Sequence, residues 1–202
     1  MSDFCYELKD SLYLNITNRC NNSCVFCIKY KTRKFESKYD LWLIREPSVK
    51  DIIDCIPDPR KYRQIVFCGY GEPLIRLEIV KEVSKILKEK SAQIRINTDG
   101  LANLFHGRNI VPELKNLVDE IFISLNAPND EQYKKICRPI FGKKSFEEII
   151  KFAKEAKKFI PRVVLTAVEL PSVDINKCAE IAKYIGVDFK ARPYYEENYK
   201  DQ

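Results

Sequence analysis

The chain has 202 residues, of which 45% are hydrophobic, and a formal net charge of +6 from 35 Lys and Arg against 29 Asp and Glu. This length supports one globular domain with a substantial core and is too short for two large ones. No apolar run approaches the roughly 20 residues that span a bilayer. The first residues, MSDFCYELKDS, lack the apolar segment of a secretory signal. These features exclude a membrane protein and predict a soluble, cytoplasmic one.

Apolar, β-rich runs alternate with helical patterns along the chain. The runs predict strands at 12–17, 64–69, 93–98, 120–125, 162–168 and 188–194. Helical periodicity lies between them, at 76–90, 145–159 and 174–186, with a further helix capped by Ser48 and a short one opening at Pro112. This alternation predicts an α/β fold with a parallel sheet. Six strands are too few for a closed eight-stranded barrel, which leaves a partial, open barrel or a doubly wound sheet.

Three cysteines follow the first predicted strand in the stretch LNITNRCNNSCVFCIKY, with the spacing CxxxCxxC. Thiolates bind soft metals, and three of them can hold a [4Fe–4S] cluster that keeps one iron open to another ligand. In a reducing compartment, the eight cysteines are expected to be ligands or free thiols more often than disulfides. The alternative is a zinc site whose fourth ligand comes from Cys5, Cys55, Cys68, Cys137, Cys178 or His106.

Unusual polar segments follow three further strands: GYGEP at 69–73, NTDG at 97–100 and SLNA at 124–127. The carboxyl ends of parallel strands meet at one edge of a sheet, so these segments and the cysteines are expected to share one site. The glycines allow a ligand to approach the backbone closely, and Glu72 offers an acceptor for an ammonium group. The alternative for GYGEP is a tight turn with a solvated glutamate. Cys68, just before it, is expected to pack as a buried strand residue, with a thiol that faces the site as the alternative.

Lysines and arginines are mixed with acidic residues over most of the chain, as on an ordinary solvated surface. The exception is the basic loop, residues 29–38, with the sequence KYKTRKFESK. A basic loop beside a metal site is suited to an anionic substrate or a nucleic acid. The alternative is a mobile surface loop.

CxxxCxxC with Phe26 before the last cysteine, followed by GYGEP after the second strand, resembles the radical S-adenosylmethionine (radical SAM) superfamily. The resemblance covers about residues 12–194, although GYGEP stands where GGEP is commonest. It implies a partial, open (βα)6 TIM-like barrel that forms a single core domain over 1–202. The absence of a second cysteine cluster after Cys27 argues against an auxiliary-cluster domain.

The resemblance also implies roles for individual residues. Cys20, Cys24 and Cys27 would hold a [4Fe–4S] cluster, whose open iron would chelate the amino and carboxylate groups of S-adenosylmethionine. Residues expected around that cofactor are Phe26 near the adenine, Gly69, Tyr70, Gly71 and Glu72 at the amino group, and Asn97, Thr98, Ser124 and Asn126 at the ribose or carboxylate. A reduced cluster would cleave the cofactor to methionine and a 5′-deoxyadenosyl radical that takes hydrogen from an unknown substrate.

The strings LNITNRC, FCGYGEPLIR, IRINTDG and ISLNAP narrow the resemblance to small radical SAM proteins associated with TatD-type hydrolases, with NTDG where NTNG is expected. The implied partners are a flavodoxin- or ferredoxin-type electron donor, a TatD-type hydrolase and an unidentified, anionic substrate. Within the enzyme class, a glycyl-radical activase and the modification of a nucleoside, another small molecule or a nucleic acid stay open. A zinc or nucleic-acid-binding module without catalysis is the alternative class.

Overall fold

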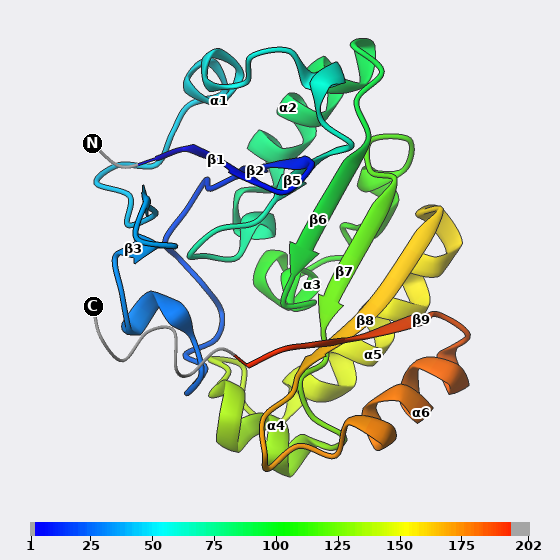
Figure 1. The fold of residues 1–202 in the computed structure, drawn as a ribbon. Helices are drawn as coiled ribbons and strands as arrows, with labels where there is room; N and C mark the ends of the chain where they lie inside the picture. Colours follow the sequence, from blue (N-terminus) through cyan, green and yellow to red (C-terminus); the bar gives the residue numbers. More distant parts are fainter. Residues whose placement is uncertain (1–2, 195–202) are drawn as a thin grey trace.

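A computed structural model of the chain describes residues 3–194, and in this part a seven-stranded sheet is the main element (Figure 1). Its strands, in spatial order, are β1 (Cys5–Leu8), β2 (Ser11–Leu14), β5 (Gln64–Phe67), β6 (Ile94–Thr98), β7 (Glu120–Ser124), β8 (Arg162–Val168) and β9 (Asp188–Arg192). The six strands from β2 to β9 are parallel, and only β1 pairs antiparallel, with β2. The sheet stays open, so the predicted α/β fold with a partial TIM-like barrel is confirmed.

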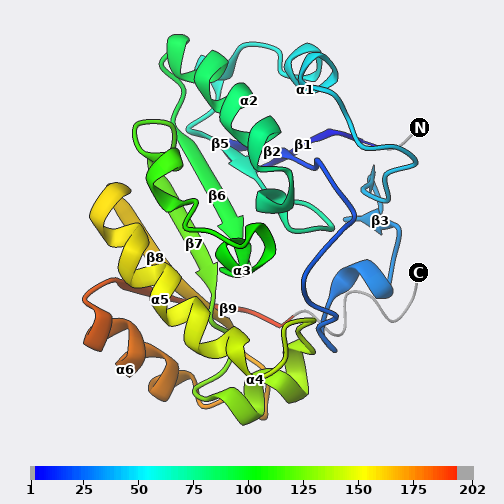
Figure 2. The same cartoon turned by 180° about the vertical axis from the view of Figure 1, so that it is seen from behind.

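The helices cover one face of this sheet, as Figure 2 shows for α2, α3 and α5. The α-helices are α1 (Val49–Cys55), α2 (Leu77–Glu89), α3 (Ala102–His106), α4 (Asp130–Cys137), α5 (Lys144–Phe159) and α6 (Ile175–Ile185). The predicted cap of α1 is present, because the Ser48 side chain accepts from the Asp51 amide and the Asp51 side chain accepts from the Ser48 amide. The helix expected at Pro112 is only the 3₁₀ turn η4 (Val111–Leu114), since the backbone becomes extended at Lys115.

Four predicted strands run past the observed ends, namely those that correspond to β2, β5, β7 and β9. β2 stops at Leu14 rather than at residue 17, and β5 stops at Phe67 rather than at residue 69. Single bonds continue the ladder just past these ends, because the Asn15 amide donates to the Phe4 carbonyl and the Cys68 amide donates to the Leu14 carbonyl. β9 likewise ends at Arg192 rather than at residue 194.

The sheet has two chemically different faces, because side chains alternate along a strand. On the helix side, Leu14, Phe67, Ile96 and Ile123 are fully or almost fully buried and belong to the main core cluster. Each such side chain stabilises the fold by about 1.5–3 kcal/mol. We call the opposite side the inner face. Strand register places on it Ser11, Tyr13, Gln64, Val66, Arg95, Asn97, Glu120, Phe122, Ser124, Arg162, Val164, Thr166, Val168, Asp188, Lys190 and Arg192.

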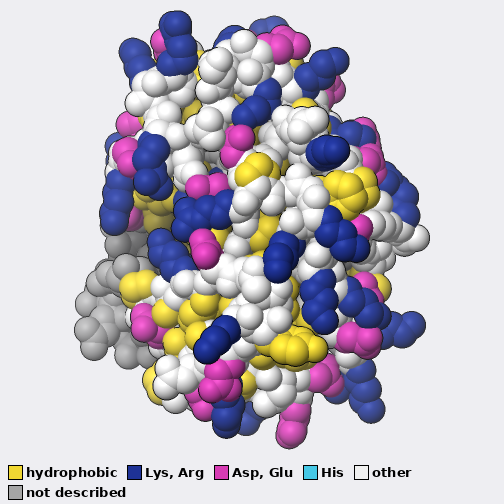
Figure 3. Space-filling view, turned by 90° about the vertical axis from the view of Figure 1, so that its right-hand side faces the viewer, with side chains coloured by type: hydrophobic (Ala, Val, Ile, Leu, Met, Phe, Trp, Pro, Cys, Tyr) yellow, Lys and Arg dark blue, Asp and Glu magenta, His cyan; other side chains and the backbone are white. Residues whose placement is uncertain are grey.

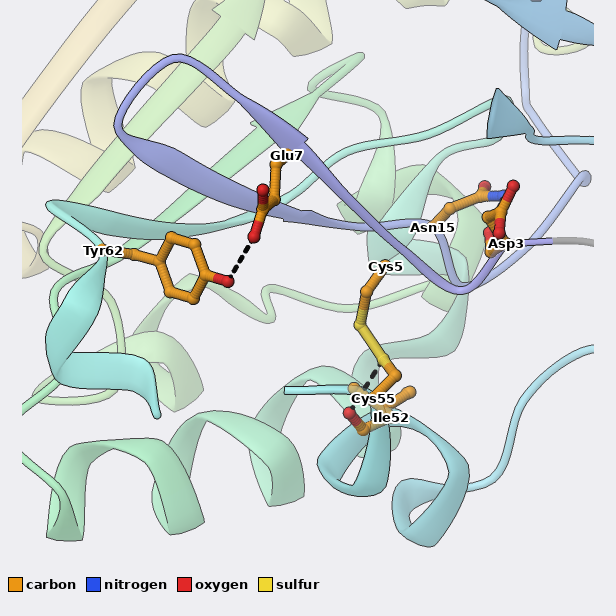
Figure 4. The surroundings of a disulfide bond; sticks show 7 residues. All are labelled: Asp3, Cys5, Glu7, Asn15, Ile52, Cys55 and Tyr62. Carbon is orange, nitrogen blue, oxygen red and sulfur yellow. Dashed lines mark hydrogen bonds between the residues drawn. A yellow bond between two sulfur atoms is a disulfide. The ribbon is translucent and has the colours of Figure 1, made fainter. Parts of the chain in front are cut away.

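A disulfide joins Cys5 of β1 to Cys55 at the end of α1, with their Cα atoms 6.1 Å apart (Figure 4). The expectation that the cysteines stay unpaired is therefore wrong for these two, and the bridge removes both from the candidate zinc ligands. The reason is that β1 was not predicted. The pairing of β1 with β2 brings Cys5 close to the last turn of α1, where Cys55 lies 50 residues later in the sequence.

Charges of both signs are interspersed on the face drawn in Figure 3, as the composition predicts for a solvated surface. Within residues 3–194, none of the helices is long and apolar enough to cross a membrane.

Candidate cofactor site

The cysteine loop, residues 20–27, is fastened to the end of α4 by the backbone. The Ser23 amide donates to the Cys137 carbonyl at 3.0 Å, and the Val25 amide donates to the Ile136 carbonyl at 2.9 Å. The Asn22 side chain donates to the hydroxyl of buried Tyr133 at 2.9 Å. The loop is therefore positioned by contacts that do not involve its thiols.

The three thiols lie partly buried near one another and near the loops that follow β5 and β6. Burial raises the pKa of Cys20, and the nearby carboxyl groups of Asp99 and Glu72 raise it further. A hydrogen bond with Cys137, followed by burial, raises the pKa of Cys24, and burial raises that of Cys27. A bound metal would reverse this preference for the neutral thiol, because thiolates are the form that binds metals.

Among the described residues, no three His, Cys, Asp or Glu side chains form a group that could hold a metal ion. A [4Fe–4S] cluster takes its thiolates on separate irons rather than around one point.

The glycines of GYGEP are needed because this turn packs against the residues that lead into the cysteine loop. A Cβ atom on Gly71 would overlap the Thr17 carbonyl oxygen and lie 2.5 Å from that of Arg19. A Cβ atom on Gly69 would overlap the Asn15 side chain. The close approach predicted at these glycines is thus an approach of backbone to protein, and it fixes the turn beside the cysteines.

Glu72 links the loops after β5 and β6. Its Oε1 accepts from the Leu74 amide at 3.0 Å and from the Thr98 hydroxyl at 2.8 Å, and its Oε2 accepts from the Asp99 amide at 2.6 Å. The side chain is 3% exposed, which differs from the solvated glutamate of the alternative interpretation. Burial, followed by the proximity of Asp99, raises the pKa of Glu72, and burial raises the pKa of Asp99 to about 6.

Tyr70, the residue by which GYGEP departs from GGEP, packs with Tyr6 and Leu41 in a second apolar cluster. Its hydroxyl donates to the Thr32 carbonyl at 2.8 Å. Tyr70 therefore ties the turn to the basic loop.

The basic loop has short regular elements at both ends. The 3₁₀ turn η1 (Ile28–Tyr30) overlaps its start, and β3 (Lys34–Phe35) within it pairs with β4 (Tyr39–Asp40) just after it. Lys29 donates to the Asn18 carbonyl at 3.0 Å, and Lys31 donates to the Tyr194 hydroxyl at 3.0 Å. Several of its charges are thus engaged within the protein.

The remaining predicted cofactor residues fall into two groups. Phe26 is half-buried against the core, and Thr98 is buried and bonded to Glu72. Asn97 and Ser124 lie half-buried on the inner face. The Oδ1 atom of Asn97 is shielded from solvent and has no hydrogen-bond partner in the described part of the chain.

Asn126 closes the same edge with a left-handed backbone (φ 55°), a conformation that asparagine tolerates better than most residues. It is buried, and its Oδ1 accepts from the Val168 amide and from Arg192, both at 3.3 Å. Asn126 therefore lies at the predicted edge, with its side chain already bonded to the protein.

Two neighbours of the cysteines differ from the sequence interpretation, which preferred a buried strand residue for Cys68 and did not consider Arg192. Cys68 follows β5, and its thiol interacts with Asn97 and Arg192, so it belongs to the inner face rather than to the core behind the sheet. Arg192 was not singled out, although Asp188, Lys190 and Arg192 alternate with Phe189 and Ala191 along β9. Three charges on one face of a strand were the signal available in the sequence.

Comparison with known sequences identifies the family. A profile described as the Radical SAM superfamily matches residues 14–185. The chain is 27% identical, over 84% of its length, to an uncharacterized protein, MJ0804, of Methanocaldococcus jannaschii, and spans 51% of that protein. It is 25% identical to a probable GTP 3′,8-cyclase of the same organism, over 92% of this chain and 62% of the relative. It is 30% identical to a probable dual-specificity RNA methyltransferase RlmN of Fervidobacterium nodosum, over 83% of this chain and 49% of the relative.

Solved structures share the fold at lower identity. TYW1 with a lysine-pyruvate adduct bound matches with a TM-score of 0.65 at 16% identity, covering 95% of this chain and 67% of that one. Streptococcus suis SuiB bound to S-adenosylmethionine matches with a TM-score of 0.69 at 16% identity, covering 93% of this chain and 41% of SuiB. The chain thus spans only part of each of these proteins. The profile nevertheless covers most of its length, and the chain belongs to the radical SAM superfamily.

Proposed function

We propose that this protein is a radical SAM enzyme, with a [4Fe–4S] cluster on Cys20, Cys24 and Cys27 and S-adenosylmethionine at the open iron. These are the two cofactors of the superfamily to which the chain belongs. Together they supply, after one-electron reduction, a 5′-deoxyadenosyl radical that removes a hydrogen atom from the substrate. We further propose that residues 12–194 act as one core domain.

One observation carries this proposal: the loops after β2, β5 and β6 meet around the thiols. Cys20 is close enough to Asp99 and Glu72 for their charges to act on its pKa. The donor set fits the cluster, because three soft ligands lie on one loop that the backbone holds in place. The unpartnered, buried Oδ1 of Asn97 on the inner face fits a site that expects a further ligand.

The residues then divide by task. Both oxygens of Glu72 are engaged by the protein, so its side chain acts as a clamp that positions the turn from Gly69 to Glu72. The backbone of that turn is our proposed partner of the methionine amino group. Phe26, Asn97, Thr98, Ser124 and Asn126 stay the proposed surroundings of the rest of the cofactor, with Thr98 acting through its bond to Glu72.

The test is anaerobic reconstitution with iron and sulfide. The wild-type chain should bind about four irons and, with S-adenosylmethionine and dithionite, release 5′-deoxyadenosine. Cys24→Ala should lose both properties. Cys178→Ala is the matched control, because Cys178 is a buried core residue of α6, and it should keep both. Zinc with no cofactor cleavage in the wild-type protein, or cleavage retained in Cys24→Ala, would refute the proposal.

A finer placement rests on the motif strings alone. We propose that the chain belongs with the TatD-associated radical SAM proteins, with a TatD-type hydrolase as partner and a flavodoxin or ferredoxin as electron donor. Reduced flavodoxin should replace dithionite in the cleavage assay, and a TatD-type hydrolase from the same cell should co-purify with the tagged chain. Failure of either result would remove the corresponding partner and leave the cleavage reaction untouched.

A further inference from the structure

The inner face carries a positive charge for which the described part of the protein provides no carboxylate. Arg192 ends β9 on this face, next to Asn126 and the cysteine loop. Its Nη2 donates to the Asn126 Oδ1 at 3.3 Å, and its Nε is shielded from solvent without a partner among residues 3–194. Buried donors are almost always hydrogen-bonded, so this atom calls for an explanation.

Three thiols act electrostatically on the Arg192 guanidinium and therefore lie near it. They belong to Cys68 after β5, Cys24 in the cysteine loop and Cys137 at the end of α4. Arg192 thus lies on the same side of the sheet as the proposed cluster. Burial lowers the pKa of Arg192, which is the effect expected for a cation removed from water without a counter-ion.

The acidic residues near this face are engaged elsewhere. Glu120 and Asp188 both pair with Arg162 at the opposite end of the strands, at 3.2 Å and 3.0 Å. Glu72 accepts hydrogen bonds from the loops around it, as described above, and none of the groups found to act on Arg192 is a carboxylate.

Two further cations share the face. Lys190 lies two residues before Arg192 on the same side of β9 and is exposed. Arg95 lies at the other end, where it donates to Gln64 at 3.0 Å and to the Tyr13 hydroxyl at 2.9 Å. The described inner face therefore carries cations at the carboxyl end of β9, and polar or aromatic side chains further along the sheet.

We propose that Arg192, assisted by Lys190, binds an anionic group of the substrate, which is therefore a small molecule or fragment that carries a carboxylate or a phosphate. The planar guanidinium presents paired donors that match such oxygens, and an anion would satisfy Nε and supply the missing counter-charge. The inference rests on the proposed function, which places the reacting centre beside Cys24. It names the substrate class that this centre would act on.

The methionine carboxylate of S-adenosylmethionine has the same chemistry, so the experiment must separate two sources of the anion. Equilibrium dialysis with labelled phosphate, and separately with labelled acetate, measures anion binding to the full chain before and after cluster reconstitution. The wild-type chain should bind at least one probe saturably in both states. Arg192→Met should weaken this binding about tenfold or more, and Arg192→Lys should restore part of it.

Arg63→Met is the matched control, because it removes the same charge from an exposed arginine that pairs with Asp10 at the far end of β2. Its anion affinity should equal that of the wild type. Circular dichroism identifies any variant that fails to fold. If Arg192→Met does not fold, the anion affinity of Arg192→Lys is compared with that of the wild type instead. Saturable binding that is equal in Arg192→Met and the wild type, or no saturable binding of either probe, overturns the proposal.

Binding of S-adenosylmethionine to the reconstituted protein settles the source of the anion. The substrate assignment predicts that the cofactor binds about equally well to the wild type and Arg192→Met, and that it binds together with phosphate or acetate. Competition between the probe and the cofactor, with a matching loss of cofactor affinity in Arg192→Met, would assign Arg192 to the cofactor carboxylate instead. Failure of the proposed function would appear separately, as a wild-type chain that does not release 5′-deoxyadenosine. Anion binding does not depend on that reaction, because it is also measured before the cluster is reconstituted.

Discussion

Removal of the Glu72 carboxylate tests whether this residue holds the site together or contacts the cofactor directly. Glu72→Ala leaves the amides of Leu74 and Asp99 and the hydroxyl of Thr98 without their acceptor. A buried donor without a partner costs about 1–3 kcal/mol, so the two amides alone account for about 2–6 kcal/mol. Relief from burying a carboxyl group beside Asp99 offsets part of this. We expect the free energy of unfolding of the cluster-free protein to fall by about 2–4 kcal/mol.

Urea unfolding of the cluster-free protein, followed by circular dichroism, measures this change. Glu72→Gln keeps one acceptor oxygen and should cost less than Glu72→Ala. Glu78→Ala is the control, because Glu78 is an exposed residue of α2, and its loss should change the free energy by less than about 0.5 kcal/mol. If Glu72→Ala is as stable as the control and yet loses S-adenosylmethionine binding, the clamp is refuted and Glu72 is a cofactor ligand.

Three further changes probe the turn, the disulfide and the surface. Gly71→Ala should destabilise the cluster-free protein by about 1–3 kcal/mol, because its Cβ overlaps backbone oxygens, and urea unfolding measures it. Cys55→Ser should lower the free energy of unfolding by about 2–4 kcal/mol relative to the oxidised wild type, since it opens the loop of 50 residues that the bond to Cys5 closes. Thiol titration of the unfolded wild-type protein should give six thiols before reduction and eight after. Arg108 and then Lys81 lower the pKa of Glu113 to about 2, so the charged form stabilises the fold above pH 4.5, and that contribution disappears as pH falls toward 2. Glu113→Gln should flatten this part of the curve of stability against pH, by no more than about 1 kcal/mol because the ion pairs are partly exposed.

Each of these expectations has an opposite outcome that would count against it. Wild-type stability in Gly71→Ala would show that the turn has room for a side chain. Eight thiols before reduction would show that the bridge does not form in solution. A curve that keeps its acid slope in Glu113→Gln would assign that slope to other carboxylates.

The sheet could be predicted because its chemistry is local. The strand at 162–168 is a continuous β-rich run, and β8 has the same bounds. The capping residues Ser48 and Gly186 mark helix ends by rules that act within a few residues. β1 escaped notice because its residues, CYEL, include a glutamate and do not form the continuous apolar, β-rich run that marked most of the other strands. Once β1 was missed, the disulfide of Cys5 could not be foreseen, since it depends on tertiary pairing.

The site was predictable in place but not in detail. The rule that ligands gather at the carboxyl ends of parallel strands brought Cys20, Glu72 and Asp99 to one edge, where the structure has them. The sequence cannot show which atom a side chain will meet. Glu72 was therefore interpreted as a ligand group, whereas its oxygens accept hydrogen bonds from the protein. Gly71 was interpreted as leaving space for a ligand, whereas backbone atoms fill the space beside its Cα atom.

The attachment of the cysteine loop to α4 bears on how a cluster would be acquired. Zinc fingers fold only when metal arrives, so metal binding must also order the chain. Here the amides of Ser23 and Val25 bond to the end of α4, and neither bond involves a thiol. Insertion of iron and sulfide would then require little rearrangement of the chain. A cluster destroyed by oxygen would leave behind a folded receptor ready for rebuilding, and maturation would become a repeatable step in the life of the protein.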